Sequence, residues 1–275
     1  MSKASSAPAS QTAAVAPILA GKHHASPSVF TPENLLREAR RQKRLAKASV
    51  PEVCILDPDG DLVRRLRTAG RARRDATWAC YHTELHRLNE SGQELGLIGC
   101  AVGAPFAVLV AEQLLASGCR FLISVTSAGR LAELRAPPYF ILIERALRDE
   151  GTSYHYLPPA EFSHADPRLL QAMTGAFAGV QVPVERGGSW TTDAPFRETP
   201  EAINAMKSKG LLAVEMEAAG LYAFATAREM PVLCFAHVTN QMAVVEGDFD
   251  KGQADGVGDA LAIIAATIRA WKDAG

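Results

Sequence analysis

Two carboxylates separated by one residue are the first candidates for chemistry in this sequence. Glu215 and Glu217 flank Met216, directly after the apolar run 211–214. In an extended segment, residues two positions apart point to the same face, so the two acids would lie together. Buried carboxylates need hydrogen-bond donors, and a sugar with two adjacent hydroxyls supplies a suitable set. The alternative is that the acids only complement the dipole of a following helix.

A second group of residues could bind an anion. Gly60 follows the apolar strand predicted at 53–56, and Arg64 lies four residues later, where a guanidinium can reach the same point as the backbone N–H groups of the turn. Thr126 and Ser127 end another predicted strand with hydroxyl and N–H groups. For both places the alternative is an ordinary polar surface turn.

An amide and a group of aromatic side chains complete the candidates. Asn240 follows the apolar strand predicted at 231–238, and the loop 188–198 contains Trp190 and Phe196 among polar residues. Such aromatic side chains could stack on a heterocycle, although a surface loop anchored by aromatics is equally consistent with the pattern. Phosphate, pentose and nucleobase would satisfy the anion, diol and amide positions respectively.

The elements that must position these residues alternate between strand and helix. Apolar segments typical of buried strands occur at 53–56, 95–99, 120–129, 140–147, 182–185, 211–214 and 231–238. The strand–helix–strand order over 95–129 predicts parallel pairing and a right-handed crossover, with the two strand ends side by side. Ligands of open α/β sheets bind at such strand ends. The segment 151–156 is predicted as strand and loop.

Bulk composition narrows the classes of protein. The 275 residues are 48% hydrophobic and 21% charged, which is enough for one α/β domain with a large core. The net charge of −1 gives no overall field for nucleic acid or membranes, and no apolar run reaches eighteen residues. Five cysteines without a CxxC pair are typical of reduced thiols in a cytoplasmic protein. The glycine-rich segment 96–105 fits neither dinucleotide nor Walker loops, and no metal site is expected.

The chain is predicted to begin with a disordered tail. Residues 1–28 are rich in Ala, Ser and Pro without hydrophobic periodicity, and they do not have the pattern of a signal peptide. Thr31-Pro32-Glu33 then has the pattern of a helix start, and the helix is expected to run to about Lys47. Residues 29–50 are therefore assigned to an N-terminal helical extension of the domain 29–275.

Together these segments resemble the nucleoside phosphorylase I family of purine nucleoside and uridine phosphorylases, from about Val53 to the C-terminal helix. The stretch 214–220 is very similar to the family, and 96–105, 126–129 and 192–196 resemble its segments in the same order. Segment 151–156 is more similar to the uridine branch, and 189–206 to the purine branch. The resemblance implies an α/β single domain with a mixed central β-sheet, partly barrel-like and flanked by helices.

The resemblance also implies roles for individual residues. It implies catalytic roles for Arg64, Glu217 and Asn240; phosphate contacts from Gly60, Arg64, Thr126 and Ser127; pentose contacts from Val102, Met216 and Glu217; and base contacts from Val214, Glu215, Phe196 and Asn240. It implies no metal and no cofactor, with inorganic phosphate as co-substrate. Partners would be a nucleoside, phosphate and further copies of the chain in a dimer, trimer or hexamer.

Three positions depart from the family pattern. Leu62 replaces the proline of the phosphate turn Gly-Asp-Pro-x-Arg, and Ser124 stands where an arginine for phosphate is usual. Asn240 replaces an aspartate that protonates the leaving base in purine-specific bacterial enzymes. The implied activity is reversible phosphorolysis of a nucleoside, with a hydrolytic nucleosidase or a non-catalytic nucleoside sensor as alternatives. Purine versus pyrimidine and ribose versus deoxyribose stay open.

Overall fold

The computed structural model describes residues 15–241 and 246–275. Its strands are β1 Val53–Asp57, β2 Ala72–Arg74, β3 His86–Glu90, β4 Gln93–Gly99, β5 Phe121–Arg130, β6 Tyr139–Asp149, β7 Phe162–His164, β8 Val184–Thr192, β9 Leu211–Glu215 and β10 Val232–Asn240. Its helices are α1 Pro32–Lys43, α2 Asp61–Thr68, α3 Ala104–Ala116, α4 Ser153–Tyr156, α5 Pro167–Ala172, α6 Pro200–Ser208, α7 Ala218–Arg228 and α8 Val257–Asp273, with 3-10 helices η1 Pro17–Leu19, η2 Pro195–Arg197 and η3 Gln253–Gly256.

The strands of the described residues form one mixed sheet that is partly closed. β10 pairs with both β6 and β5, so the order β5–β10–β6–β8–β9–β5 returns to its start and makes a five-stranded, barrel-like ring. Within the ring, β10 runs parallel to β5 and β8 parallel to β6 and β9, while β6 is antiparallel to β10 and β9 to β5. The predicted α/β fold with a partly barrel-like mixed sheet is confirmed.

A flat arm of strands leaves the ring at β5. The order continues β5–β1–β4–β3–β2, and β1 is parallel to both β5 and β4. The predicted parallel orientation of β4 and β5 is correct, but their expected adjacency was wrong because β1 lies between them. The turn after β1 therefore lies between the ends of β4 and β5. An anion bound at this turn could also contact polar groups at the ends of both neighbouring strands.

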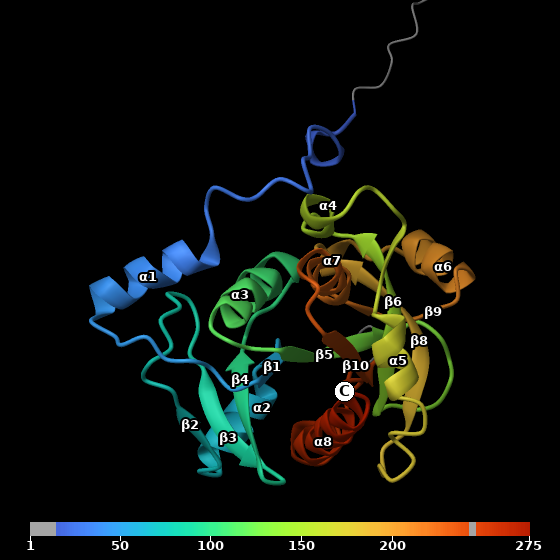
Figure 1. Ribbon diagram of the computed structural model, residues 1–275. Coiled ribbons are helices and arrows are strands. Elements are labelled where there is room, and N and C mark those ends of the chain that lie inside the picture. The colour runs from blue at the N-terminus through green and yellow to red at the C-terminus, as the bar shows by residue number, and fades with distance from the viewer. Residues whose placement is uncertain (1–14, 242–245) are drawn as a thin grey trace, which may run out of the picture.

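Helices cover both faces of the sheet where β5 and β10 meet. Figure 1 shows α3 and α7 on one side and α8 on the other, and α7 packs on α3 and α4 while α8 packs on α2 and α5. These helices bury long apolar faces, and β5 and β10 are buried along nearly their whole length. Burial on both faces explains why these strands read as continuous apolar runs in the sequence.

The N-terminal elements differ in detail from the sequence expectation. Thr31 caps α1 as predicted, but the helix ends at Lys43 rather than near Lys47, because Arg44 takes a left-handed conformation. Segment 151–156 was wrongly assigned to strand and loop, since it contains the short helix α4.

The predicted tail lies partly outside the described residues. Residues 1–14 are not among them, whereas residues 15–28 include η1, and His24 hydrogen bonds the carbonyl of Tyr154 near α4. The boundary at residue 28 stays a prediction. Across residues 15–241 and 246–275, none of the helices has both the length and the apolar character that a membrane crossing requires.

The contact between α3 and α7 yields a first testable prediction. A Cβ atom added at Gly220 in α7 would lie 2.7 Å from the Cβ atom of Ala104 in α3. The Cβ atom of Ala104 is attached directly to the backbone of α3 and cannot move aside without moving the helix. Gly220→Ala should therefore lower the free energy of unfolding by about 1–3 kcal/mol. Chemical denaturation measures this loss.

The matched control is a glycine-to-alanine change in another helix. Gly258 lies in α8 with no atom within 4 Å of the added Cβ. Gly258→Ala should therefore raise the free energy of unfolding, by up to about 1 kcal/mol, through helix propensity alone. Equal effects of the two substitutions would show that the close approach of α3 and α7 does not limit the fold.

Candidate active site

Strand β5 brings three of the predicted clusters together. Its residue Gly129 lies opposite Val214 of β9 on one side and Asn240 of β10 on the other. Two residues earlier, Ser127 lies opposite His237 of β10. The strand predicted at 120–129, with Thr126 and Ser127 near its end, is confirmed as β5, which ends at Arg130 because β9 and β10 both pair with its last residues. The acid, hydroxyl and amide clusters are therefore neighbours across three adjacent strands.

The carboxylate of Glu215 is fully used inside the protein. One of its oxygens accepts hydrogen bonds from the hydroxyls of Ser189, at 2.9 Å, and Thr191, at 2.5 Å. The other accepts from the backbone N–H groups of Glu217 and Ala218, each at 2.7 Å. Glu215 is buried and its pKa is raised by that burial. It thus joins β8 and β9 to the start of α7, which favours a structural role over the implied contact with a base.

Glu217 differs from Glu215 in having one oxygen available. Its side chain is 1% exposed, and Oε1 accepts a 2.7 Å hydrogen bond from the N–H of Gly103, just before α3. Oε2 is buried and has no hydrogen-bond partner among the described residues. Burial, with a contribution from the charge of Glu215, raises the pKa of Glu217 to about 8. A hydroxyl of a bound sugar would give Oε2 the donor that it lacks.

The predicted phosphate turn is formed by the chain between β1 and α2. Gly60 adopts a positive φ of 78° as it precedes α2, which a residue with a side chain rarely adopts. Arg64, on the first turns of α2, is not free to bind a ligand without rearrangement, because its guanidinium pairs with Asp61 and, at 3.3 Å, with Asp255. Its side chain is 58% exposed.

Two charged residues at this turn were missed by the sequence reasoning. Asp59 accepts hydrogen bonds from Ser127, from the backbone N–H at 2.9 Å and from the hydroxyl at 2.8 Å. Lys251 approaches Asp59 at 3.4 Å and Asp61 at 2.5 Å. Asp59 follows the same strand as Gly60 and could have been noticed from the run of acids at 57, 59 and 61, but no local pattern indicates Lys251.

The residues implied to surround the base are only partly gathered. Val214 and Asn240 are buried, on either side of Gly129. The amide nitrogen of Asn240 donates a hydrogen bond to the hydroxyl of Thr239 at 3.2 Å. Met216, between the two acids, is partly buried. By contrast, Val102 is 51% exposed.

Phe196, implied to contact the base, is not packed in this chain. Its side chain lies in η2 and is 99% exposed. Trp190 was wrongly assigned to the same loop: it lies in β8, where it is buried and its indole N–H donates to Asp149 at 2.9 Å. Of the two aromatics considered for stacking, one is thus part of the core and the other is open to solvent.

The positions where cations were expected lack free positive charge. Ser124 is buried in β5, and its hydroxyl has no hydrogen-bond partner among the described residues. Arg130, the arginine at the end of the same strand, donates to the side chain of Gln241 and to the carbonyl of Arg135. Arg130 therefore does not replace the positive charge that is missing at position 124, where Ser124 stands in place of the family's usual arginine.

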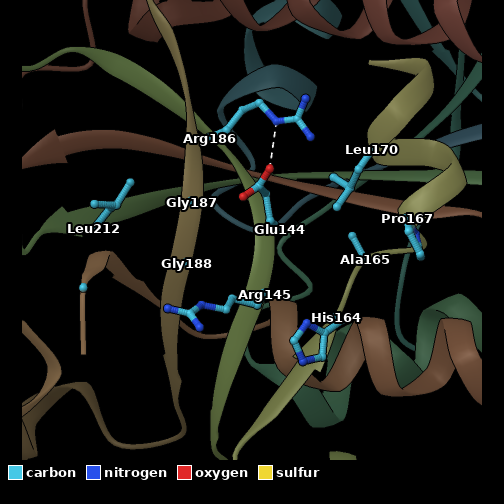
Figure 2. Close-up of a pocket in the computed structure, with 11 residues that line it drawn as sticks. Glu144, Arg145, His164, Ala165, Pro167, Leu170, Arg186, Gly187, Gly188 and Leu212 are labelled. Atoms are coloured by element: carbon cyan, nitrogen blue, oxygen red, sulfur yellow. Dashed lines mark hydrogen bonds and ion pairs between the residues drawn. The ribbon is translucent and has the colours of Figure 1, made fainter. Parts of the chain in front are cut away.

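A separate hollow lies at the opposite ends of β8 and β9. It has a volume of about 660 Å³, and Figure 2 shows Arg186 paired with Glu144 above it and Arg145 beside Gly188 below. The guanidinium of Arg145 also lies 4.7 Å from the centre of the Phe162 ring. None of the predicted site residues lines this hollow.

Comparison with known proteins identifies a family. The sequence model of the phosphorylase superfamily matches residues 52–269. A purine nucleoside phosphorylase of the DeoD type from Jannaschia sp. (strain CCS1) is 28% identical over 162 residues, which is 56% of this chain and 67% of that protein. A guanosine phosphorylase from Halorubrum lacusprofundi is 25% identical over 181 residues, 65% of this chain and 74% of that protein. The chain spans about two thirds of the length of the first of these relatives.

Solved structures show the same fold. A uridine phosphorylase from Vibrio fischeri ES114 superposes with a TM-score of 0.67 at 21% identity, covering 92% of this chain and 99% of that one. A purine nucleoside phosphorylase from Toxoplasma gondii, in complex with immucillin-H, superposes with a TM-score of 0.68 at 20% identity, covering 83% and 94%. At this identity the likeness establishes the fold alone.

The raised pKa of Glu217 predicts how stability depends on pH. Its folded-state pKa of about 8 lies above the ordinary 4.5, so between these values the folded protein holds a proton that the unfolded chain has lost. The contribution of protonated Glu217 to the free energy of unfolding is therefore lost as pH rises through this range. Glu217→Gln removes the titration, and from pH 5 to pH 8 its free energy of unfolding should rise by about 1–3 kcal/mol relative to wild type.

Denaturation at a series of pH values tests this, with Glu38→Gln as the control. Glu38 is exposed on α1, and hydrogen bonds from Arg41 and Arg37 lower its pKa, so it does not titrate between pH 5 and 8. Stability curves of Glu217→Gln and wild type that run parallel over this range would contradict the assignment of Glu217 as a proton-holding acid.

Proposed function

The chain belongs to the phosphorylase superfamily, and from this premise we propose that it cleaves the N-glycosidic bond of a nucleoside by pentosyl transfer. The products would be a free base and, with inorganic phosphate as acceptor, a pentose 1-phosphate. The observation that carries the proposal is the buried carboxyl of Glu217, one oxygen of which has no hydrogen-bond partner among the residues that the structure describes. Glu217 follows β9, which pairs with β5, the strand that contains Ser127. A buried acid left open in this way favours a ligand with hydroxyl donors.

Glu217 and Met216 are proposed to hold the pentose. Glu217 is fixed by the N–H of Gly103 on one oxygen, so the other keeps a set direction toward the hydroxyls of the sugar. Fixing the pentose in advance lowers the entropic cost of aligning the anomeric carbon with its acceptor. Cleavage would pass through an oxocarbenium-like transition state, by analogy with glycoside cleavage.

Asn240 and Val214 are proposed to border the base. An amide cannot donate a proton in the manner of an acid, but its N–H group can hydrogen bond a carbonyl oxygen on which negative charge develops as the base departs. This chemistry favours bases with a carbonyl, such as 6-oxopurines and pyrimidines. The burial of Asn240 strengthens such a hydrogen bond, because water does not compete for it.

Gly60, Arg64, Ser127 and Thr126 are proposed to hold the phosphate. The turn at Gly60 and the N–H and hydroxyl of Ser127 come from adjacent strands β1 and β5, which supports a shared anion position. Phosphate bound there would face the anomeric carbon of a pentose held by Glu217.

A second candidate function is hydrolysis, with water as the acceptor. It is favoured by one specific observation: the donors of Ser127 already hold the carboxylate of Asp59. A nucleosidase and a phosphorylase would share the pentose and base positions and differ only at this acceptor position.

Further copies of the chain are proposed as partners. Phe196, implied by the family resemblance to contact the base, is 99% exposed, and a neighbouring subunit is one way to cover it. We propose a homo-oligomer on this ground and on the resemblance, with inorganic phosphate and a nucleoside as the other partners.

A substrate screen tests the proposed activity. Inosine, guanosine, adenosine, uridine and thymidine are incubated with the protein, with and without inorganic phosphate, and base release is measured. We expect release from at least one nucleoside with a carbonyl-bearing base, and slower release from adenosine. Release that depends on phosphate supports phosphorolysis, and equal release without phosphate supports hydrolysis. No release from any nucleoside under either condition would refute both.

Substitution of Glu217 tests the pentose position. Glu217→Ala should lower kcat/KM for the cleaved nucleoside by about 10–100-fold, because it removes a buried hydrogen bond to the sugar. Glu38→Ala, which removes an exposed carboxylate from α1, is the control and should leave kcat/KM unchanged. Unchanged turnover in a folded Glu217→Ala protein would remove Glu217 from the pentose site.

A further inference from the structure

The anion position of the site is already filled by a side chain of the protein. Both carboxylate oxygens of Asp59 accept hydrogen bonds from Ser127, one from its N–H at 2.9 Å and the other from its hydroxyl at 2.8 Å. These are the two donors that Ser127 offers to a bound anion. Asp59 thus holds an oxyanion where the proposed function needs one from phosphate.

The cations of this position are also paired within the protein. Lys251 lies 3.4 Å from Asp59 and 2.5 Å from Asp61. Arg64 pairs with Asp61 and Asp255. Each of the two cations nearest the turn after β1 therefore contacts two carboxylates, and phosphate must compete for them.

The space beside Ser127 is too small for a phosphate ion. The hollow lined by Asp57, Asp59, Asp61, Ser127 and His237 has a volume of about 20 Å³, which is room for a single water molecule. His237 adds no positive charge near neutral pH, since burial lowers its pKa to about 4. Phosphate can enter only if Asp59 moves away, and it then meets the negative charge of the remaining acids.

We propose that Asp59 is an internal competitor for the phosphate position and thereby determines which acceptor the site uses. The proposal rests on the proposed function, of which it specifies the acceptor. With Asp59 on Ser127, water is the acceptor that fits. With Asp59 displaced or removed, the N–H and hydroxyl of Ser127 are released, and Lys251 keeps only Asp61 as a partner.

The physical basis is competition between a tethered and a free anion. Asp59 is connected to Ser127 through a short turn and adjacent strands, so its local concentration exceeds that of dissolved phosphate. Removing its charge eliminates both the competitor for the donors and the repulsion between two anions at close range. Phosphate affinity should rise by about tenfold or more.

The experiment compares wild type with Asp59→Asn and Asp59→Ala by titration with inorganic phosphate, followed by calorimetry. Asp59→Asn keeps the shape of the side chain and protects the measurement against a folding defect in Asp59→Ala. The control is Asp166→Asn, which makes the same charge change at the partly exposed N-cap of α5, where Asp166 pairs with Arg168. We expect at least a tenfold lower Kd for phosphate in an Asp59 variant and no change in Asp166→Asn.

The possible results of this titration distinguish a failure of the inference about Asp59 from a failure of the proposed function. Equal phosphate affinity in wild type and both Asp59 variants, or no measurable binding by any of them, would overturn the inference and assign Asp59 a role in holding the turn only. Tighter binding by an Asp59 variant supports it, and the same variant should then show a lower KM for phosphate in base release. Because the titration needs no nucleoside, a failure of all five nucleosides to react would refute the proposed function without deciding the role of Asp59.

Discussion

The candidate site depends on one strand that pairs with three others. β5 lies beside β1 for its first half, beside β10 for most of its length and beside β9 at its end. This succession allows the flat arm and the closed ring to share a strand. The turn after β1 and the end of β9 then meet β5 at Ser127 and Gly129 respectively, and the end of β10 meets it from the other side. The strand continues past Ser127 to Arg130 because its last residues pair with β9 and β10.

The two acids beside α7 show how a buried charge can be made tolerable and useful. Glu215 receives four hydrogen bonds, which offset part of the cost of its burial, and in accepting two of them from the backbone it fixes the chain that follows it. Glu217 accepts one backbone hydrogen bond, from Gly103, and burial raises its pKa to about 8. The first acid thus positions the second. The close contact of α3 with α7 at Gly220 supports the same arrangement, because it holds the N–H of Gly103 beside Glu217.

Sequence reasoning succeeded where short-range patterns determine the outcome. The seven predicted apolar strands and the position of Glu217 after one of them follow from apolar runs and the chain order, whereas the mixed, partly barrel-like sheet was implied by the family resemblance. It failed where contacts between distant segments decide, as for Asp59 with Ser127, 68 residues apart, and Lys251 with Asp59, 192 apart. It also placed β4 next to β5, because local order does not reveal that β1 inserts between them. The exposure of Phe196 likewise depends on how a loop packs, which its aromatic character alone does not predict.

These contacts divide the proposed reaction into parts that are fixed by different forces. The pentose and base positions are built into buried backbone and side chains of β9, α7 and β10, so altering them means altering the core. The acceptor position instead rests on ion pairs at a partly exposed turn, where Arg64 is 58% exposed and Lys251 is 23% exposed. Pairs of this kind contribute little to stability and rearrange at low cost. A chain with this fold can therefore change its acceptor by substituting a single aspartate, while the groups that recognise the nucleoside stay in place.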